Sequence, residues 1–160
     1  MRRIVLGAVA GVLAGILFGV MMQMMTAPTP EGTRVPMMAM VAMVVGSTSL
    51  AVGWVYHLFN SAVIGGLFGL LLGGRVHSIG GGLGWGAVWG IVWWVLGGLI
   101  LMPLLLEMPA FAPLMMPEMR MVAVGSLFGH LMYGLVLGAG YGKLSPRARA
   151  GSPAASVRVG

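Results

Sequence analysis

The sequence predicts an all-α membrane protein with four transmembrane helices, and three observations lead to that prediction. Of the 160 residues, 59% are apolar and only 8% are charged, with a mean hydropathy of +1.00. So little charge could not cover the surface of a soluble domain. The apolar residues fall into four runs long enough to cross a bilayer, and the charged residues lie between or outside these runs.

The first run covers residues 4–25 and follows Arg2 and Arg3. Two arginines before an apolar stretch are also how a secretory signal peptide begins. This run is longer than a signal core, and Pro28 follows the one small-residue cleavage position at Ala27. We therefore expect it to be retained as the first transmembrane helix.

The other spans are expected at about 50–72, 80–102 and 120–141, each close to the 20 or so residues that a bilayer requires. Residues 26–36 contain three prolines and are expected to form a loop. Residues 37–45 are apolar but too short to span, so we expect an interfacial or re-entrant segment.

Residues 1–142 are thus expected to form one transmembrane domain, and 143–160 a basic tail with almost nothing to bury, which predicts disorder. The distribution of charge predicts the orientation. If the N-terminus is cytoplasmic, seven of the nine basic residues lie on that side, and all three glutamates lie on the other. This bias predicts a cell-membrane protein with both termini in the cytoplasm.

The chain also contains an internal repeat. A nine-residue motif, His-Leu-x-x-Ser/Gly-x-Val-x-Gly, begins at His57 and recurs 73 residues later at His130. A Gly-Ala-Val-x-Gly motif in the first run recurs 79 residues later in the third. We expect two tandem two-helix hairpins, about 4–72 and 80–142, related by a pseudo-two-fold axis along the membrane normal.

Small residues recur every four positions along each expected span. On a helix such positions lie nearly above one another, so they form a narrow seam along which a second backbone can approach closely. We expect the four helices to pack along these glycine-rich seams, through Gly11, Gly15, Gly65, Gly69, Gly86, Gly90, Gly134 and Gly138.

His57 and His130 lie on these seams at equivalent places in the two units. An imidazole at membrane depth is costly unless it has a partner, so we predict that both rings face the bundle interior. With Gln23, Asn60 and Ser61 they form a candidate polar or ligand site. In the simplest interpretation the neutral rings bond to a carbonyl, a glutamine or each other and fix helix packing. Paired axial ligation of a haem iron is an alternative.

The chain is also methionine-rich, with sixteen methionines that cluster toward the expected outer face. Thioethers bind Cu(I) well, so a copper site beside an imidazole is a second alternative. Methionine also fills irregular apolar interfaces, and spacing alone does not distinguish a ligand from a packing residue. The clusters are 21–25, 37–43 and 115–121.

Catalysis has little support in the sequence. The only carboxylates are three glutamates in expected connections, so no acid lies in a span to relay a proton. Ser61 follows His57 by four residues, but no third group orients the pair. Cysteine is absent, and no phosphate-binding loop, dinucleotide motif or zinc motif occurs.

We therefore expect a non-enzymatic accessory or helix-packing subunit without a resident cofactor. Its expected partners are the lipid bilayer and either further copies of the chain or a larger membrane complex. The basic residues are divided among segment ends, which argues against nucleic acid as a partner. The alternative is an outer-face Cu(I) or haem site, or a small transporter-like protein, that uses the pair His57 and His130.

Several apolar motifs resemble those of a group of small uncharacterised four-helix, multi-pass membrane proteins of bacteria and archaea. The resemblance covers about residues 4–142 and implies a multi-pass membrane protein, without implying an activity. The motifs are Pro36-Met37-Met38, Val45-Gly46-Ser47, Gly53-Trp54-Val55-x-His57-Leu58, Trp93-Trp94-x-Leu96-Gly97-Gly98 and Met102-Pro103.

Overall fold

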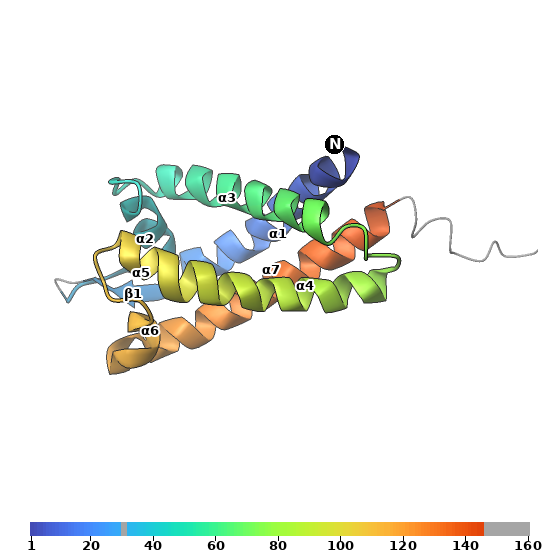
Figure 1. Ribbon diagram of the computed structural model, residues 1–160. Helices are drawn as coiled ribbons and strands as arrows, with labels where there is room; N and C mark the ends of the chain where they lie inside the picture. Colours follow the sequence, from blue (N-terminus) through green and yellow to red (C-terminus); the bar gives the residue numbers. More distant parts are fainter. Residues whose placement is uncertain (30–31, 146–160) are drawn as a thin grey trace, which may run out of the picture.

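The computed structural model describes residues 1–29 and 32–145, which are mostly helical (Figure 1). In this part of the chain, four helical segments are long and apolar enough to cross a membrane: Arg2–Met24 (α1), Leu50–Leu71 (α3), Ile79–Leu105 and Pro117–Leu144. Such lengths and compositions are compatible with a multi-pass membrane protein.

Two of these segments are composite. The third consists of α4 (Ile79–Trp93), the π-helix η1 (Trp94–Leu101) and α5 (Met102–Leu105). The fourth consists of the 3₁₀-helix η2 (Pro117–Met119) and α7 (Arg120–Leu144). Because α7 continues to Leu144, the expected tail boundary at 143 is corrected by two residues. Residues 146–160, and with them the predicted disorder, lie outside the described residues.

Pro103 accounts for the π-helix in the third segment. A proline has no N–H, and its ring crowds the carbonyl four residues earlier, here that of Leu99. The Leu99 carbonyl instead accepts a hydrogen bond of 2.6 Å from the backbone N–H of Phe111. The N–H of Met102 bonds to the carbonyl of Gly97, the wider spacing of a π-helix. The helix thus passes Pro103, and the predicted end at 102 is three residues early.

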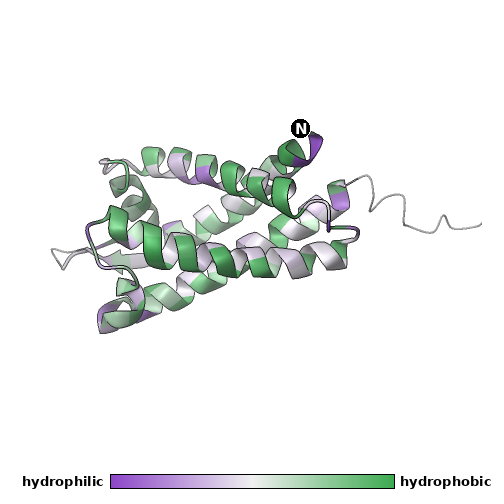
Figure 2. Ribbon diagram, in the orientation of Figure 1, coloured by the Kyte–Doolittle hydropathy of each residue, from purple (hydrophilic) through white to green (hydrophobic). Residues whose placement is uncertain are grey.

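The four long helices pack in a chain of pairs, seen in Figure 1 as two crossed layers. The most extensive contacts join α1 to α3 and α4 to α7, and α1 also packs against α7. Most of the helical ribbon carries apolar residues (Figure 2). Many large apolar side chains are exposed on the outer surface, for example Leu13 of α1, Val55 and Phe59 of α3, and Phe128 of α7. An apolar exterior of this extent is compatible with a lipid environment.

Glycines allow the backbones within each pair to approach closely. A Cβ atom on Gly11 would collide with the carbonyl oxygen of Ser61, and one on Gly86 with the carbonyl oxygen of Gly134. Similar collisions would occur at other glycines of these helices. Those with a backbone atom of the opposing helix as nearest neighbour are Gly7, Gly65, Gly69, Gly82, Gly90, Gly134 and Gly138.

Residues 26–28 and 34–36 form two paired strands, whereas a loop was expected over 26–36. Strand β1 (Thr26–Pro28) pairs antiparallel with β2 (Arg34–Pro36), with Ala27 opposite Val35. Arg34 closes the open end of the pair by donating from Nη2 to the Thr26 carbonyl at 3.0 Å and from Nε to its hydroxyl at 3.2 Å. The prolines are tolerated because a two-stranded sheet consists only of edges.

Helix α2 (Met37–Met43) follows the hairpin and closes the same end of the bundle (Figure 1). It packs against α3 and α1, and residues 37–42 are all buried. A Cβ on Gly53 would collide with the carbonyl of Met38, so α2 lies directly on the first turn of α3. The short helix α6 (Ala112–Met115) packs against α7. These elements cover the end of the bundle at which the candidate site lies.

Candidate functional site

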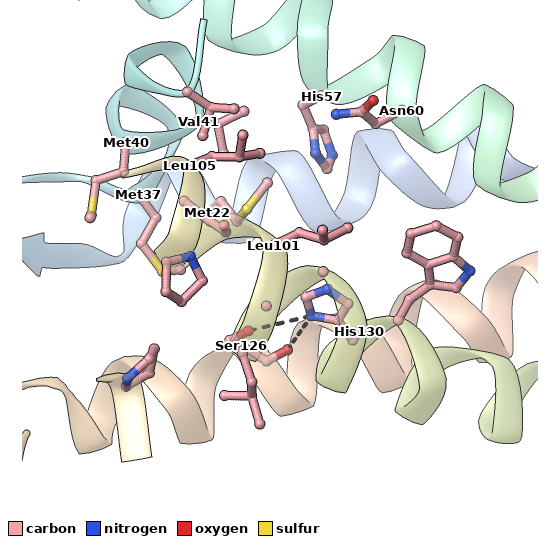
Figure 3. A pocket seen from close by; sticks show the side chains of 18 of the residues that line it. Met22, Met37, Met40, Val41, His57, Asn60, Leu101, Leu105, Ser126 and His130 are labelled. Carbon is pink, nitrogen blue, oxygen red and sulfur yellow. Dashed lines mark hydrogen bonds between the residues drawn. The ribbon is translucent and has the colours of Figure 1, made fainter. Parts of the chain in front are cut away.

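A cavity of about 380 Å³ lies between α3 and η1 and is partly open to the surroundings. Its walls come from α1, α2, α3, η1, α5, α6 and α7, and Figure 3 shows part of the lining. The cavity exists because α3 packs on α1, and α4 on α7, while α3 and α4 have no extensive contact with each other. Its lining includes both candidate histidines together with Asn60 and Ser61.

His57 is held by a hydrogen bond to the neighbouring helix. Its side chain is buried, and its Nε2 atom lies 2.8 Å from the carbonyl oxygen of Gly15 on α1. Because a carbonyl oxygen only accepts, Nε2 must carry the proton, and in a neutral ring Nδ1 is then an acceptor. Ser61 does not bond to the ring, since its hydroxyl donates to the His57 carbonyl at 2.8 Å.

His130 bonds within its own helix. Its Nδ1 atom lies 2.8 Å from the carbonyl oxygen of Ser126 and 3.4 Å from the Ser126 hydroxyl (Figure 3). The proton must therefore be on Nδ1, which leaves Nε2 as an acceptor. A Cβ placed on Gly97, which lines the cavity, would be 3.9 Å from this Nε2 atom. The acceptor nitrogen of His130 thus lies at the η1 wall of the cavity.

Phe18 of α1 packs between the two imidazoles. Its ring centroid is 5.6 Å from that of His57 and 4.9 Å from that of His130, both in edge-to-face geometry. On the same level, the Tyr133 hydroxyl of α7 donates to the Ser61 carbonyl of α3 at 2.7 Å. The Phe18 ring therefore separates the two histidines, and the Tyr133 hydroxyl links α7 to α3 beside it.

Of the remaining predicted residues, Asn60 lines the cavity and Gln23 does not. The Asn60 carboxamide, labelled beside His57 in Figure 3, makes no hydrogen bond within 1–29 and 32–145. The Oε1 atom of Gln23 is buried without a partner in the same part of the chain. The structure therefore brings four of the five predicted polar residues together and leaves Gln23 apart from them.

Six methionines contribute to the cavity wall. The lining has no charged side chain, and the described residues hold no group of three or more histidines or carboxylates that could bind a metal ion. Methionine is not among those residue types, and its thioether is a soft ligand that suits Cu(I). They are Met22, Met37, Met40, Met102, Met108 and Met119.

Sequence reasoning missed three features of this site. Phe18 gave no signal, because an apolar residue on an apolar helix is unremarked in the sequence. Tyr133 follows His130 by three residues, as Asn60 follows His57, and this correspondence was available. The distortion at η1 was also available, since Pro103 follows an uninterrupted apolar run. π-helical segments are frequently found at functional sites.

No protein-family model, curated protein or solved structure matches this chain.

Proposed function

We propose that the chain is a multi-pass protein of the cell membrane with both termini in the cytoplasm, built from two tandem hairpins. The hairpins are α1 with α3 and α4 with α7, each packed along its glycine seam. Support comes from the extensive contact within each pair and from the repeated sequence motifs. The basic residues at the turn between α3 and α4 and around both termini support the orientation.

The glycine contacts support the repeat with one change of register. A Cβ on Gly7 would meet the carbonyl of Gly65, and one on Gly82 would meet that of Gly138. Gly65 and Gly138 are 73 residues apart, as are the two histidines, so Gly82 is the packing counterpart of Gly7. The sequence motif instead aligns Gly7 with Gly86. The two alignments differ by one helical turn, which keeps the same seam in contact.

Reporter fusions test the topology. We expect an exterior signal from a fusion at Gly32 and cytoplasmic signals from fusions at Gly74 and Gly160. An exterior signal at Gly74 or Gly160 would overturn the proposed orientation.

Within the membrane, the proposed role is that of a non-enzymatic accessory or helix-packing subunit. The observation that carries it is the outer face of α4. The segment Ile79–Leu105 is the least buried of the four, with 17% of its most apolar stretch covered. This face presents a further glycine, Gly84, where an added Cβ would meet nothing within 4 Å. Gly80 precedes it by four residues, the spacing along which a helix of another subunit packs closely.

Substitution at Gly84 tests this role. We expect Gly84→Leu to abolish co-purification of partner subunits, or of a second tagged copy, from mild detergent while leaving the fold unchanged. Val55→Leu, on the exposed surface of α3 and outside the proposed interface, is the control. Undiminished association of the Gly84→Leu chain would contradict the proposal. Ester hydrolysis by the isolated protein that is lost in Ser61→Ala and kept in Ser126→Ala would contradict the non-enzymatic role.

A metal-binding role is the second candidate, because six methionines and two imidazoles line one cavity. Of the two metal centres considered, Cu(I) is favoured over haem, since Phe18 packs against both histidine rings and His57 Nε2 is bonded to Gly15. Metal analysis and an absorption spectrum of protein purified from its membrane distinguish them. A colourless, copper-free sample that takes up no Cu(I) would eliminate both.

A further inference from the structure

The cavity combines an apolar wall with polar atoms that have no hydrogen-bond partner among residues 1–29 and 32–145. Asn60 offers an unbonded carboxamide from α3, and His130 offers an unbonded Nε2 from α7. No charged side chain lines the cavity. A charged ligand would lose its hydration on entering the cavity and would find no opposite charge there, so an occupant must be neutral. Its volume of about 380 Å³ lies within the roughly 300–1,000 Å³ of ordinary ligand pockets.

The tautomers of the histidines restrict the polar group of such an occupant. His130 donates from Nδ1 to Ser126, and His57 donates from Nε2 to Gly15, so each ring has only an acceptor nitrogen left. A ligand that bonds to His130 Nε2 must therefore supply a donor, which a hydroxyl does and a carbonyl does not. Asn60 can donate or accept and does not discriminate between the two.

The apolar part of the wall favours an aromatic ring. Phe18, Tyr56 and Trp93 line the cavity, and aromatic side chains contact ring ligands at their edges and faces. The six methionines add flexible thioethers, which make favourable contacts with aromatic rings. The cavity lies between two membrane-spanning segments that are not packed on each other, which gives a bilayer amphiphile a lateral route to it.

We propose that this cavity binds an uncharged amphiphile whose hydroxyl-bearing aromatic ring donates a hydrogen bond to His130 Nε2, the chemistry of a membrane quinol. The ring lies among the methionine and aromatic side chains, and a second oxygen of the ring bonds to Asn60. The apolar tail leaves between α3 and η1 into the bilayer. This binding goes beyond the accessory role proposed above and does not require a partner subunit.

Native mass spectrometry of the full chain in mild detergent tests the proposal with decylubiquinol, kept reduced under argon, and decylubiquinone. We expect one quinol per chain, bound about tenfold more tightly than the quinone, because the quinone has no donor for His130. Failure to bind the quinol, or equal affinity for the two forms, would overturn the proposal. This comparison uses the unmodified protein and does not depend on the folding of any variant.

Two variants then locate the site. His130→Leu should bind both forms equally, and His77→Leu, in the exposed turn between α3 and α4, should keep the preference for the quinol. Gly97→Leu should lose both forms, because Gly97 lines the cavity and an added side chain there takes up ligand space, while its Cβ meets only ordinary contacts of 3.7 and 3.9 Å. Val92→Phe adds bulk on the exposed face of α4 and should bind normally. A quinol preference that survives His130→Leu would place the ligand elsewhere and refute the site.

Discussion

The α1–α3 and α4–α7 pairs approach through corresponding glycines, yet they hold their histidines differently. In the first pair, His57 bonds across to the carbonyl of Gly15 on the other helix. In the second, His130 bonds back to Ser126 on its own helix. Beside the His57 contact, the side chain of Ser61 packs against Gly15. Gly134, which corresponds to Ser61 in the sequence repeat, has no side chain to make such a contact.

The difference shows that a shared backbone arrangement does not fix the role of an equivalent side chain. The helix opposite His130 is also distorted into a π-helix, while the helix opposite His57 is regular. In the first pair the histidine therefore joins two helices, and in the second it bonds only within its own helix, although each ring keeps one acceptor nitrogen. Substitutions can therefore test separately the close glycine contacts that both pairs share and the side-chain contacts in which they differ.

The largest effect is expected where the two pairs are alike. Gly11→Leu and Gly86→Leu should each lower the free energy of unfolding by about 3 kcal/mol or more, because the side chain would force two backbones apart. Unfolding by SDS in mixed micelles, followed by helical circular dichroism, measures this. Gly84→Leu is the control, because an added Cβ at Gly84 meets open space, and it should change the free energy of unfolding of the monomer little. A mild effect at Gly11 or Gly86 would refute the close packing of that pair.

The histidines should show where the pairs differ. His57→Ala should cost about 2 kcal/mol, because it removes a bond between helices and a contact with Phe18. His130→Ala removes a similar ring contact but only a bond within one helix, so its cost should be smaller by about 1 kcal/mol. His57→Leu should be worse than His57→Ala, since it adds branched bulk to the seam. The same unfolding assay measures all three, and equal costs for the two alanine variants would remove the distinction.

Tyr133→Phe tests the connection between the two pairs. The Tyr133 hydroxyl bonds to the Ser61 carbonyl at 2.7 Å and links α7 to α3. Its loss should cost about 1 kcal/mol, since the ring and its packing remain. Tyr56→Phe, in which no hydroxyl bond to the described residues is lost, is the control. A cost at Tyr133 no larger than at Tyr56 would mean that the bridge contributes nothing.

The smallest effect is expected at Trp94, in the first turn of η1. Its indole N–H donates to the Ala123 carbonyl of α7 at 3.3 Å, which is a long bond. Trp94→Phe should therefore cost about 0.5 kcal/mol, measured in the same assay. A cost above about 2 kcal/mol would show that the π-helix depends on this contact and would change the account that assigns it to Pro103.

The sequence predicts the four long apolar helices and their limits to within a few residues, because length and hydropathy are local properties. It also identified His57, His130, Asn60 and Ser61, which stood out as polar groups in apolar runs. The paired strands at 26–28 and 34–36 were not predicted, because the prolines in this region indicated a loop. Strand pairing also depends on a partner strand, which a local pattern does not reveal.

The contacts that the polar residues make depend on how the helices pack, which the sequence pattern does not show. Which nitrogen of each histidine is bonded depends on which carbonyl lies within reach, and that follows from the packing of α1 and from the geometry of α7. The cavity, too, is a property of arrangement, since it forms where α3 and α4 are held apart by their separate partners. Gln23 illustrates the limit of the pattern: it shares the seam of α1, yet it lies outside the cavity that the other four polar residues line.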